Sequence, residues 1–385
     1  MIQTQRRLAP RLSATSLPWP TDWDKVFGVA SAVTPVAEQT ESQVASEVPE
    51  NTADQVTTDA LPLSTRDSAL LLLEVGFGYG HFLRHLSATN PDARIIGLEI
   101  ASECLLHVEH QIDRGDMPNA RVLFSRADTA LYHLFEPETI DQIHVNFPDP
   151  WFKSRHERRR LMQRPTTDLM ASRLKPGGML YLATDIPEYA EMADEALRGT
   201  PGLVNTLGAA WSVEPLPGRI VTKYERKALA AGRGCHYFAY RRDETPLEIS
   251  VLREAEMMHM TVALPLSANE IAARFQQFEA KAIAREPANT GENIVVKALQ
   301  AFVGDKAVMI ECYVAEPTIH QHIGVMVVPL RERPGEYTVG LSGIGTPRPT
   351  DGLHYAARKV AEWLATLHPD AKITSDKARS GYVEV

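Results

Sequence analysis

The residues of this sequence that could do chemistry come in short groups, each of which follows an apolar run. The first group places Glu74 ahead of three alternating glycines, Gly76, Gly78 and Gly80. Glycine lets a backbone turn tightly and approach a ligand closely. The spacing differs from the G-x-G-x-x-G of dinucleotide-binding folds and lacks the Lys-Ser/Thr pair of a phosphate-binding loop. By itself, this turn leaves a nucleotide-type ligand and a purely structural role equally open.

Two carboxylates follow the next two apolar runs. Glu99 ends the run RIIGLE, and a carboxylate in this place can accept hydrogen bonds from both hydroxyls of a ribose. Asp128 follows the run ARVLFSR. The structural alternatives are an exposed glutamate at a strand end and, for Asp128, a ligand contact made by a neighbouring backbone group.

The stretch NFPDPWFKSRHERRRL, residues 146–161, joins a strand end to a Pro-Asp-Pro-Trp turn that contains Asp149. A cluster of positive charge follows, made of Lys153, Arg155, Arg158, Arg159 and Arg160. A basic run is most often a solvated helix face. This run, however, stands beside a rigid aromatic turn in a chain whose formal net charge is -9, which favours contacts with the phosphates of a nucleic acid.

An alternation of strand and helix patterns positions these groups. Strands are predicted near residues 70–77, 93–100, 120–126, 141–147 and 178–185. Nearly continuous apolar strands separated by helices indicate an α/β fold with a parallel sheet covered by helices on both faces. Ligands of such sheets bind at the carboxyl ends of the strands, so we expect the groups described above to converge there.

Four motifs in this order resemble the tRNA (guanine-N7)-methyltransferase family, whose members have a Rossmann-like class I methyltransferase sheet. The glycine turn matches the first motif of class I methyltransferases, and residues 146–161 resemble the Asp-Pro-Trp signature of the family. LATDIPEYA resembles its Thr-Asp segment, and TKYERKALAAGRGCHYFAYRR resembles its Thr-Lys-(Phe/Tyr)-Glu segment. The resemblance covers residues 70–242, and TDWDKVFG at 21–28 resembles the family's lead-in, from which Trp23 and Phe27 are expected to pack on the catalytic domain.

The resemblance implies transfer of a methyl group from S-adenosylmethionine to N7 of guanine 46 in the variable loop of tRNA. It implies cofactor-side roles for Glu74, Gly76, Gly78, Gly80, Glu99, Asp128 and Asp149. It implies substrate-side roles for Lys153, Asp185, Thr222, Lys223, Tyr224 and Glu225, and phosphate contacts for Arg155, Arg158, Arg159 and Arg160. Asp149 is the first candidate for the catalytic carboxylate, and Asp185 and Glu225 are candidates for holding the guanine.

Structural alternatives remain for these carboxylates. Asp149 could cap a turn, Asp185 could cap the helix that starts near Pro187, and Glu225 could pair with an arginine. Two other functions also remain: a class I methyltransferase with another RNA or a non-RNA substrate, and a non-catalytic RNA-binding protein that keeps the fold. The intact glycine turn and Glu99 speak against the last.

Four parts are predicted along the chain. Composition indicates an acidic disordered linker or insertion at 31–65, and the family resemblance implies a lead-in at 1–30 and a methyltransferase domain at 66–242. The strand and helix patterns of residues 243–385 predict a smaller α+β domain. Residues 31–65 hold six acidic residues and no Lys or Arg, and therefore bury too little to fold. The three cysteines lack the spacing of a zinc site or a disulfide framework. No apolar run is long enough to span a membrane and no secretory signal is evident, so we expect a cytoplasmic protein, monomer or homodimer.

The part at 243–385 does not resemble the catalytic family. It is predicted to hold a mainly antiparallel sheet with two amphipathic helices. One helix starts at the capping box of Ser267 and Glu270 and is expected to bury Ile271, Phe275 and Phe278, and the other runs over 351–367. His320 and His322 share a strand face, without a third metal ligand. Dimerisation, a brace on the catalytic domain and recognition of tRNA shape are the roles left open.

Overall fold

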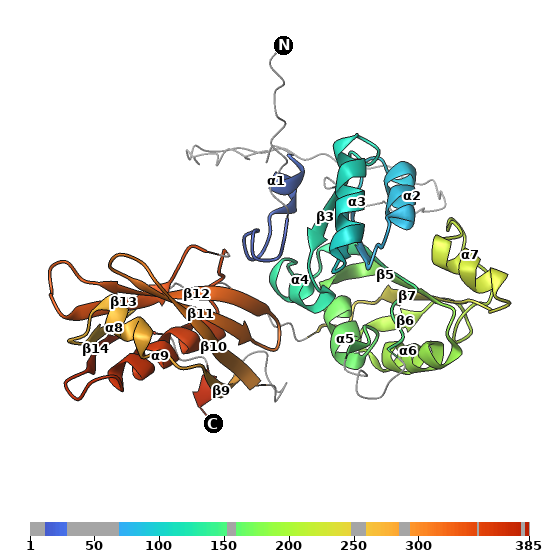
Figure 1. Ribbon diagram of the computed structural model, residues 1–385. Coiled ribbons are helices and arrows are strands. Elements are labelled where there is room, and N and C mark those ends of the chain that lie inside the picture. The colour runs from blue at the N-terminus through green and yellow to red at the C-terminus, as the bar shows by residue number, and fades with distance from the viewer. Residues whose placement is uncertain are drawn as a thin grey trace, which may run out of the picture.

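The computed structural model describes residues 12–28, 69–151, 159–247, 259–284, 293–344, 346–378 and 382–384. The predictions for residues 31–65 and for Lys153, Arg155 and Arg158 lie outside these ranges. The described residues form two sheets that lie side by side, each with its own helices (Figure 1). No helix within the described ranges is long and apolar enough to cross a membrane.

The first sheet has seven strands in the order β3-β2-β1-β4-β5-β7-β6. The strands are β1 (Leu71–Val75), β2 (Arg94–Glu99), β3 (Ala120–Phe124), β4 (Ile140–Asn146), β5 (Leu174–Thr184), β6 (Leu203–Asn205) and β7 (His236–Arg242). Strands β1 to β5 pair in parallel, which confirms the predicted parallel sheet, whereas β7 pairs antiparallel with both β5 and β6. The strand order reverses between β1 and β4, and such a reversal opens a crevice for a ligand at the carboxyl edge.

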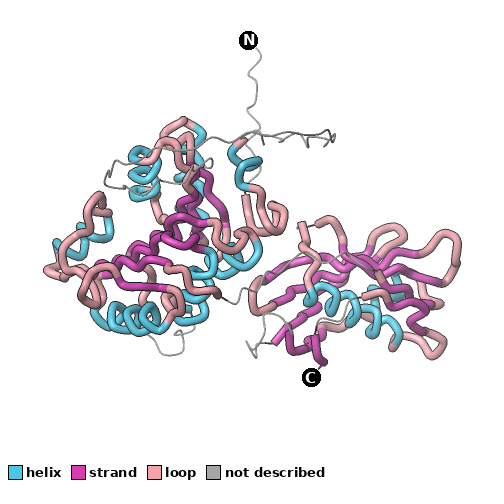
Figure 2. The backbone as a smooth tube through the Cα atoms, turned by 180° about the vertical axis from the view of Figure 1, so that it is seen from behind, coloured by secondary structure: helices cyan, strands magenta, loops and turns pink. Residues whose placement is uncertain are grey.

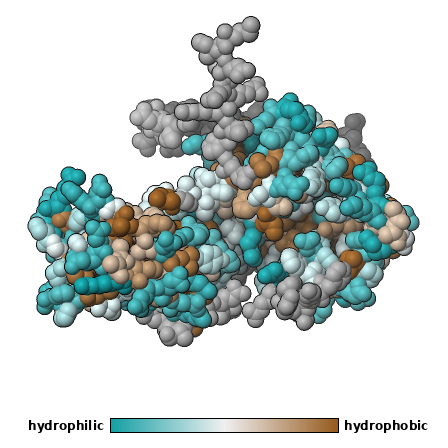
Figure 3. Space-filling view, viewed as in Figure 1, coloured by the Kyte–Doolittle hydropathy of each residue, from teal (hydrophilic) through white to brown (hydrophobic). Residues whose placement is uncertain are grey.

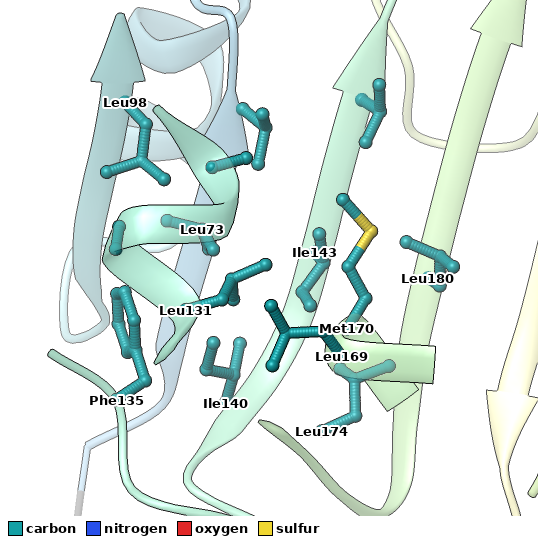
Figure 4. Packing of buried hydrophobic residues seen from close by; sticks show 14 of the residues in the cluster. Leu73, Leu98, Leu131, Phe135, Ile140, Ile143, Leu169, Met170, Leu174 and Leu180 are labelled. Atoms are coloured by element: carbon teal, nitrogen blue, oxygen red, sulfur yellow. The ribbon is translucent and has the colours of Figure 1, made fainter. Parts of the chain in front are cut away.

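Helices cover both faces of the first sheet. Successive side chains of its central strands point to opposite faces, and both sets are apolar. The helices are α2 (His81–Thr89), α3 (Ser102–Asp113), α4 (Ala127–His133), α5 (Arg164–Arg173), α6 (Pro187–Gly199) and α7 (Lys223–Ala230). On β1, Leu71 and Leu73 pack into the apolar core shared with α4, α5 and α6, whereas Leu72 packs into the core shared with α2 and α3. Figure 4 shows the first of these cores, in which Leu73, Leu131, Ile143 and Met170 meet.

Residues 12–28 pack along the β3 side of this sheet. Ser13 forms a parallel bridge with Phe124, and the short helix α1 (Trp23–Phe27) follows. Trp23 is buried and stacks on Phe135 with ring centroids 4.8 Å apart, and Phe27 packs at the margin of the same core. The prediction that Trp23 and Phe27 pack on this part of the chain is therefore confirmed.

The second sheet has eight strands in the order β14-β8-β13-β12-β11-β10-β9-β15, and every pair is antiparallel. Its strands are β8 (Met260–Ala263), β9 (Phe278–Ala284), β10 (Asn293–Val303), β11 (Val308–Ala315), β12 (His320–Pro329), β13 (Glu336–Leu341), β14 (Lys372–Asp376) and β15 (Tyr382–Glu384). The helices α8 (Ala268–Ala273) and α9 (Asp351–Ala365) pack against it through Ile271, Leu353 and Val360. This arrangement confirms the predicted α+β part with a mainly antiparallel sheet.

One prediction for this region is wrong. The helix that starts at Ser267 ends at Ala273, so it buries Ile271 but not Phe275 or Phe278 as helical residues. Phe278 begins β9 instead, because pairing of β9 with β10 overrides the helical periodicity of the sequence.

His320 and His322 are both exposed on one face of β12. Apolar surface is visible on this part of the molecule (Figure 3).

The two sheets meet beside α4. The Arg348 guanidinium donates to the carbonyl oxygen of Thr15 at 2.7 Å and to that of Leu17, and His133 Nε2 lies 3.0 Å from Thr318 Oγ1. Since α4 runs back from the carboxyl end of β3, His133 at its far end lies toward the amino edge of the first sheet. Helix α7 lies on the side of the first sheet away from the second (Figures 1 and 2).

Candidate active site

The glycine turn after β1 is held by the neighbouring strand. Gly76 N donates to Leu98 O at 2.8 Å, and Gly78 N donates to Glu99 Oε2 at 2.9 Å. Gly76 and Gly78 adopt φ angles of +74° and +54°, a region that L side chains rarely occupy. A Cβ atom at position 76 would have no neighbour within 4 Å, so the turn leaves open space above its backbone.

The Glu99 carboxylate is oriented by three backbone N–H groups. Besides Gly78 N, the N–H groups of Ile100 and Ala101 donate to Oε1 at 2.7 and 2.9 Å. A carboxylate has about four acceptor sites, so hydroxyl groups of a ligand can still donate to it. Ile100 next to it is 60% exposed and offers an apolar contact at the same edge. Sequence reasoning missed Ile100, although its place directly after a strand-end carboxylate was a signal.

A hollow lies between the glycine turn, the end of β4 and the start of α7, and is called the first hollow below. Its volume is about 370 Å³, which includes space open to solvent. Its lining residues are Glu74, Gly76, Phe77, Tyr79, His81, Phe82, Asn146, Phe147, Thr222, Lys223 and Tyr224. The lining thus brings together Glu74 and Gly76 of the first motif and three residues of the Thr-Lys-Tyr-Glu segment, whereas Gly78, Gly80 and Glu225 are not part of it. Tyr224 reaches over the turn, since its Cε2 atom lies 3.7 Å from where a Cβ atom of residue 78 would be.

Glu74 forms the buried end of the first hollow. Asn146 Nδ2 donates to its Oε1 at 3.2 Å, whereas Oε2 has no hydrogen-bond partner among the described residues. Burial raises the pKa of Glu74 to about 8, although Asn146 and Arg219 lower it. A buried carboxylate with an unused acceptor beside a cavity is the arrangement expected of a group that meets a positively charged or N–H-bearing ligand.

Arg219 connects Glu74 to the rest of the site, and sequence reasoning missed it. Its Nη1 donates to Asn146 Oδ1 at 2.9 Å, and its guanidinium lies over the rings of Phe82 and Tyr237 at 5.1 and 5.4 Å. The side chain is only 7% exposed. Asn146 is thereby held with its amide nitrogen toward Glu74. The only sequence signal was an arginine three residues before Thr222.

Thr222 and Glu225 form the capping box of α7. Glu225 N donates to Thr222 Oγ1, and Thr222 N donates to Glu225 Oε2, both at 3.2 Å. Tyr237 OH donates to Glu225 Oε1 at 2.5 Å, and Arg219 Nη2 lies 3.9 Å from Oε2. Glu225 is 1% exposed, and its carboxylate holds the first turn of α7. Its nearness to Arg219 agrees with the structural alternative in which Glu225 pairs with an arginine.

The loop after β4 presents Asp149 at the surface. Phe147 and Trp151, on either side of the Pro-Asp-Pro turn, adopt positive φ angles of 51° and 43°, which are strained for large side chains and cluster at functional sites. Phe147 N donates to Ala183 O at 2.7 Å, and Arg160 Nε donates to Pro150 O at 3.1 Å, so the loop is tied at both ends. The Arg159 guanidinium lies 5.1 Å from the Trp151 ring.

The charge of Asp149 affects the pKa values of two tyrosines, Tyr224 and Tyr189. Burial, and after it Cys104 and Asp149, raise the pKa of Tyr224. Burial also raises the pKa of Tyr189 on α6, and Asp149 contributes to that rise. Asp149 is therefore close enough to the hydroxyl groups of Tyr224 and Tyr189 to contribute to the rise of both pKa values.

The other two predicted carboxylates have partners within the protein. Arg233 Nε donates to Asp185 Oδ2 at 2.8 Å, and Arg126 donates to both oxygens of Asp128 at 3.0 and 2.6 Å. Both aspartates follow strands of the first sheet at its carboxyl edge, as expected. Within the described ranges, no three His, Cys, Asp or Glu side chains are grouped as metal ligands.

A family model matches the part of the chain that forms the first sheet. This model, described as "Putative methyltransferase", matches residues 68–238. A protein of Burkholderia ambifaria named tRNA (guanine-N(7)-)-methyltransferase is 39% identical over 176 residues, which are 46% of this chain and 68% of that protein. Proteins of the same name from Treponema pallidum and Thiobacillus denitrificans are each 38% identical over 44% of this chain, and the matches cover 65% and 74% of their lengths.

Among solved structures, TrmN from Thermus thermophilus matches 46% of this chain and 44% of its own chain at 18% identity. Its TM-score of 0.34 is too low to support any statement about function. The curated relatives, in contrast, match at 36% identity or more over about two thirds of their length. The chain therefore belongs to the tRNA (guanine-N7)-methyltransferase family of S-adenosylmethionine-dependent enzymes.

Proposed function

We propose that the protein transfers a methyl group from S-adenosylmethionine to N7 of guanine 46 in the variable loop of tRNA. The names of its relatives support a tRNA guanine substrate. The observation that carries the proposal is the loop after β4, whose ends adopt strained φ angles at Phe147 and Trp151. This loop presents the exposed Asp149 two residues after Phe147, which lines the first hollow, and shortly before a run of cations. This loop combines a carboxylate for the base with positive charge for the RNA backbone. Because tRNA is the proposed substrate, we expect the protein to act in the cytoplasm.

The first hollow fits the cofactor. The free Oε2 atom of Glu74 can accept a hydrogen bond from the cofactor's ammonium group, and the Glu99 carboxylate can accept from ribose hydroxyls. Asp128, on the next loop of the same edge, is proposed on the adenine side. When bound, the cofactor supplies an electrophilic methyl group. Its positive ammonium group beside Glu74 would also favour the ionised carboxylate, which burial alone disfavours.

The proposed reaction does not require a general base on the protein. Guanine N7 carries a lone pair in the base plane, so no proton has to be removed before it attacks. Alignment of the reacting atoms can supply up to about 7–11 kcal/mol of the barrier. Positive charge spreads over the purine as the bond forms, and the carboxylate of Asp149 stabilises that charge.

Access to the base explains the cations. Guanine in folded tRNA is stacked or paired, and exposing it costs a few kcal/mol. Contacts between phosphates and cationic side chains offset that cost. Arg159, which is exposed, is proposed as one such contact together with Arg155, Arg158 and Arg160, and Lys153 as a substrate contact.

The decisive experiment incubates the purified full chain with S-adenosylmethionine and unmodified tRNA. Nuclease digests are then searched for 7-methylguanosine by mass spectrometry. We expect the nucleoside with wild-type tRNA, none at that position when guanine 46 is replaced by adenine, and strongly reduced formation by Asp149→Ala. Undiminished formation by Asp149→Ala would contradict the catalytic role of that carboxylate.

The same assay separates the other functions. Methylation of total RNA but not of tRNA would identify another RNA substrate. Binding of tRNA without any methyl transfer would identify a non-catalytic RNA-binding protein. Modification of tRNA at a different guanine would leave the reaction class intact and overturn only the position.

A further inference from the structure

We propose that the second sheet and its helices, called the α+β part below, position the adenine side of the cofactor site, and that Arg348 is the positioning residue. This role rests on the proposed function, in which Asp128 lies on the adenine side. The α+β part lies beyond residues 68–238, which the family model matches, so the role is additional to those of the matched part. Two segments connect the α+β part to Asp128, namely residues 12–21 of the lead-in and helix α4.

Arg348 binds the lead-in through its backbone. Its Nε donates to Thr15 O at 2.7 Å and its Nη2 donates to Leu17 O. Because both acceptors belong to one turn, the planar guanidinium fixes the backbone of that turn. Arg348 is held in place by Gln321 of β12, whose Oε1 accepts from Arg348 N at 2.8 Å and whose Nε2 donates to Arg348 O at 3.1 Å. The turn of the lead-in is thus attached to the second sheet itself (Figure 1).

The residues just before this turn hold the carboxyl end of β3. Ser13 forms a parallel bridge with Phe124, the last residue of β3, and Phe124 N donates to Leu12 O at 3.1 Å. β3 is an edge strand of the first sheet, so the lead-in covers its outer side. A single bridge compensates for only part of the conformational entropy that a segment loses on ordering. The lead-in is therefore held from two sides, by β3 and by Arg348.

Helix α4 is the second connection. It carries Asp128 in its first turn and ends at His133. His133 Nε2 lies 3.0 Å from Thr318 Oγ1, in the turn between β11 and β12, and the His133 ring stacks on Trp19 of the lead-in with centroids 3.9 Å apart. Ile319, next to Thr318, is buried in the apolar core of the first sheet. The α+β part thus contacts the far end of the helix that carries Asp128.

The segment with Asp128 is consequently fixed at both ends. The lead-in holds Phe124 before it, and Thr318 holds His133 after it. A helix of two turns moves as one unit, so a displacement at its end also moves its start. If the arrangement that binds the cofactor is populated only in part, the apparent dissociation constant rises by the inverse of that fraction. Loss of these contacts should therefore weaken cofactor binding without changing any reacting group.

Two other roles of the α+β part have different signatures. A merely structural contact lowers the melting temperature and leaves the cofactor affinity of the folded chain unchanged. A contact with tRNA changes the Michaelis constant for tRNA. The charge of residues 243–385, with 14 Lys and Arg against 19 Asp and Glu, disfavours a broad phosphate-binding surface. The contact at the far end of α4 also lies away from the carboxyl edge, where the cofactor and the base are proposed.

The test is a double-mutant cycle on the full chain, in which titration calorimetry measures the dissociation constant of S-adenosylmethionine. Arg348→Ala should weaken binding about fivefold, within the range of about twofold to thirtyfold for residues that act on a site from a distance. Arg348→Lys keeps the charge but loses the fork that reaches two carbonyl oxygens, so its effect should be smaller. Thr318→Val removes only the contact with His133 and should act in the same direction, which decides the case if Arg348→Ala does not fold.

The cycle locates the effect within the cofactor site. In an Asp128→Ala background, Arg348→Ala should weaken binding by less than about a further twofold, because the group that it positions is already absent. In a Glu74→Gln background, at the other end of the proposed cofactor site, Arg348→Ala should keep its full effect. Equal effects in the two backgrounds overturn the positioning role.

Arg331→Ala is the matched control, since Arg331 is an exposed arginine in the turn after β12 that takes part in none of these contacts. It should leave the dissociation constant unchanged. In steady-state methylation, Arg348→Ala should raise KM for S-adenosylmethionine and leave kcat and KM for tRNA unchanged. A raised KM for tRNA alone, or a lower melting temperature with unchanged cofactor affinity, overturns the positioning role while the proposed function stands. Absence of 7-methylguanosine from the wild-type reaction overturns the proposed function, and the calorimetric cycle still decides the role of Arg348.

Discussion

Each of the two sheets buries a glutamate, and the two carboxylates differ in what surrounds them. Glu316, after β11, accepts hydrogen bonds from Thr350 Oγ1 and from Gly352 N, the latter at 2.8 Å, at the start of α9. Glu74, on β1, accepts one hydrogen bond from Asn146, and its second oxygen is unused among the described residues. Burial raises the pKa of Glu316 to about 7 and that of Glu74 to about 8.

We propose that this difference separates a structural carboxylate, Glu316, from a ligand-binding carboxylate, Glu74. Burying a carboxylate is costly in either place, but the second sheet compensates for it with a helix start and a hydroxyl. In the first sheet, one buried oxygen of Glu74, a lining residue of the first hollow, has no hydrogen-bond partner among the described residues. Burial and a raised pKa are common to both, so the unused hydrogen-bonding capacity is the feature that distinguishes the ligand site.

The largest expected effect is on cofactor binding. Glu74→Gln should weaken binding of S-adenosylmethionine by about tenfold to a hundredfold, the usual weight of a hydrogen bond to a charged group. Titration calorimetry on the full chain measures the dissociation constant. Glu316→Gln is the control and should leave the constant unchanged. Equal changes of the dissociation constant in the two variants would contradict the proposal that Glu74 binds the cofactor and Glu316 does not.

The pH dependence sharpens the same comparison. Bound S-adenosylmethionine favours the ionised form of Glu74, whose pKa without cofactor is about 8, so binding below that pH releases a proton. Affinity should therefore rise by up to about tenfold per pH unit toward pH 8 and level off above it. Titration across pH 6.5–9 tests this, and the rise should be absent in Glu74→Gln. A rise that persists in Glu74→Gln assigns the titration to another group.

Stability without cofactor has the opposite dependence on pH. Both glutamates have folded-state pKa values above the ordinary value of 4.5, so between pH 4.5 and about 7 or 8 the folded state keeps protons that the unfolded state has lost. The free energy of unfolding should fall as pH rises through that window, and each Glu→Gln substitution should remove its part of the slope. Urea unfolding at several pH values measures it.

Gly352→Ala tests the structural side of the comparison. A Cβ atom at position 352 would overlap the Glu316 carboxyl group. We expect a loss of about 1–3 kcal/mol in the free energy of unfolding, with unchanged methylation kinetics of the folded chain. Gly343→Ala is the control, because a Cβ atom there meets nothing within 4 Å, and it should change stability by less than about 0.5 kcal/mol. Comparable losses in the two variants would contradict the role of Glu316.

The smallest effect concerns RNA binding. Arg159→Ala should weaken tRNA binding a few-fold and reduce the slope of log affinity against log salt concentration by about 0.7–0.9, the loss of one phosphate contact. Lys281→Ala, on the second sheet, removes a cation paired with Glu279 at 3.0 Å and should change neither quantity. An equal change in both variants would make the second sheet part of the RNA-binding surface.

Much of the fold followed from local sequence patterns. The apolar runs and glycines predicted β1 to β5 and the turn after β1, because strand burial and positive φ angles limit the residues that can stand there. The antiparallel β7 and the strands β9 and β10 were not predicted, because strand direction and pairing depend on residues far away in the sequence. The same reason explains why Phe278 was placed in a helix.

At the site, the sequence by itself determined which chemical groups are present and that they meet at one edge of a sheet. It predicted Glu74, Glu99 and Asp149 as site residues because strand ends of a parallel sheet converge. Only the tertiary structure decided how each group is used. Whether a carboxylate is free depends on neighbours from other elements, such as Tyr237 beside Glu225 and Arg233 beside Asp185. For the same reason the contacts of Arg219 emerged only from the three-dimensional arrangement, since a side chain's partners are a property of packing and not of spacing along the chain.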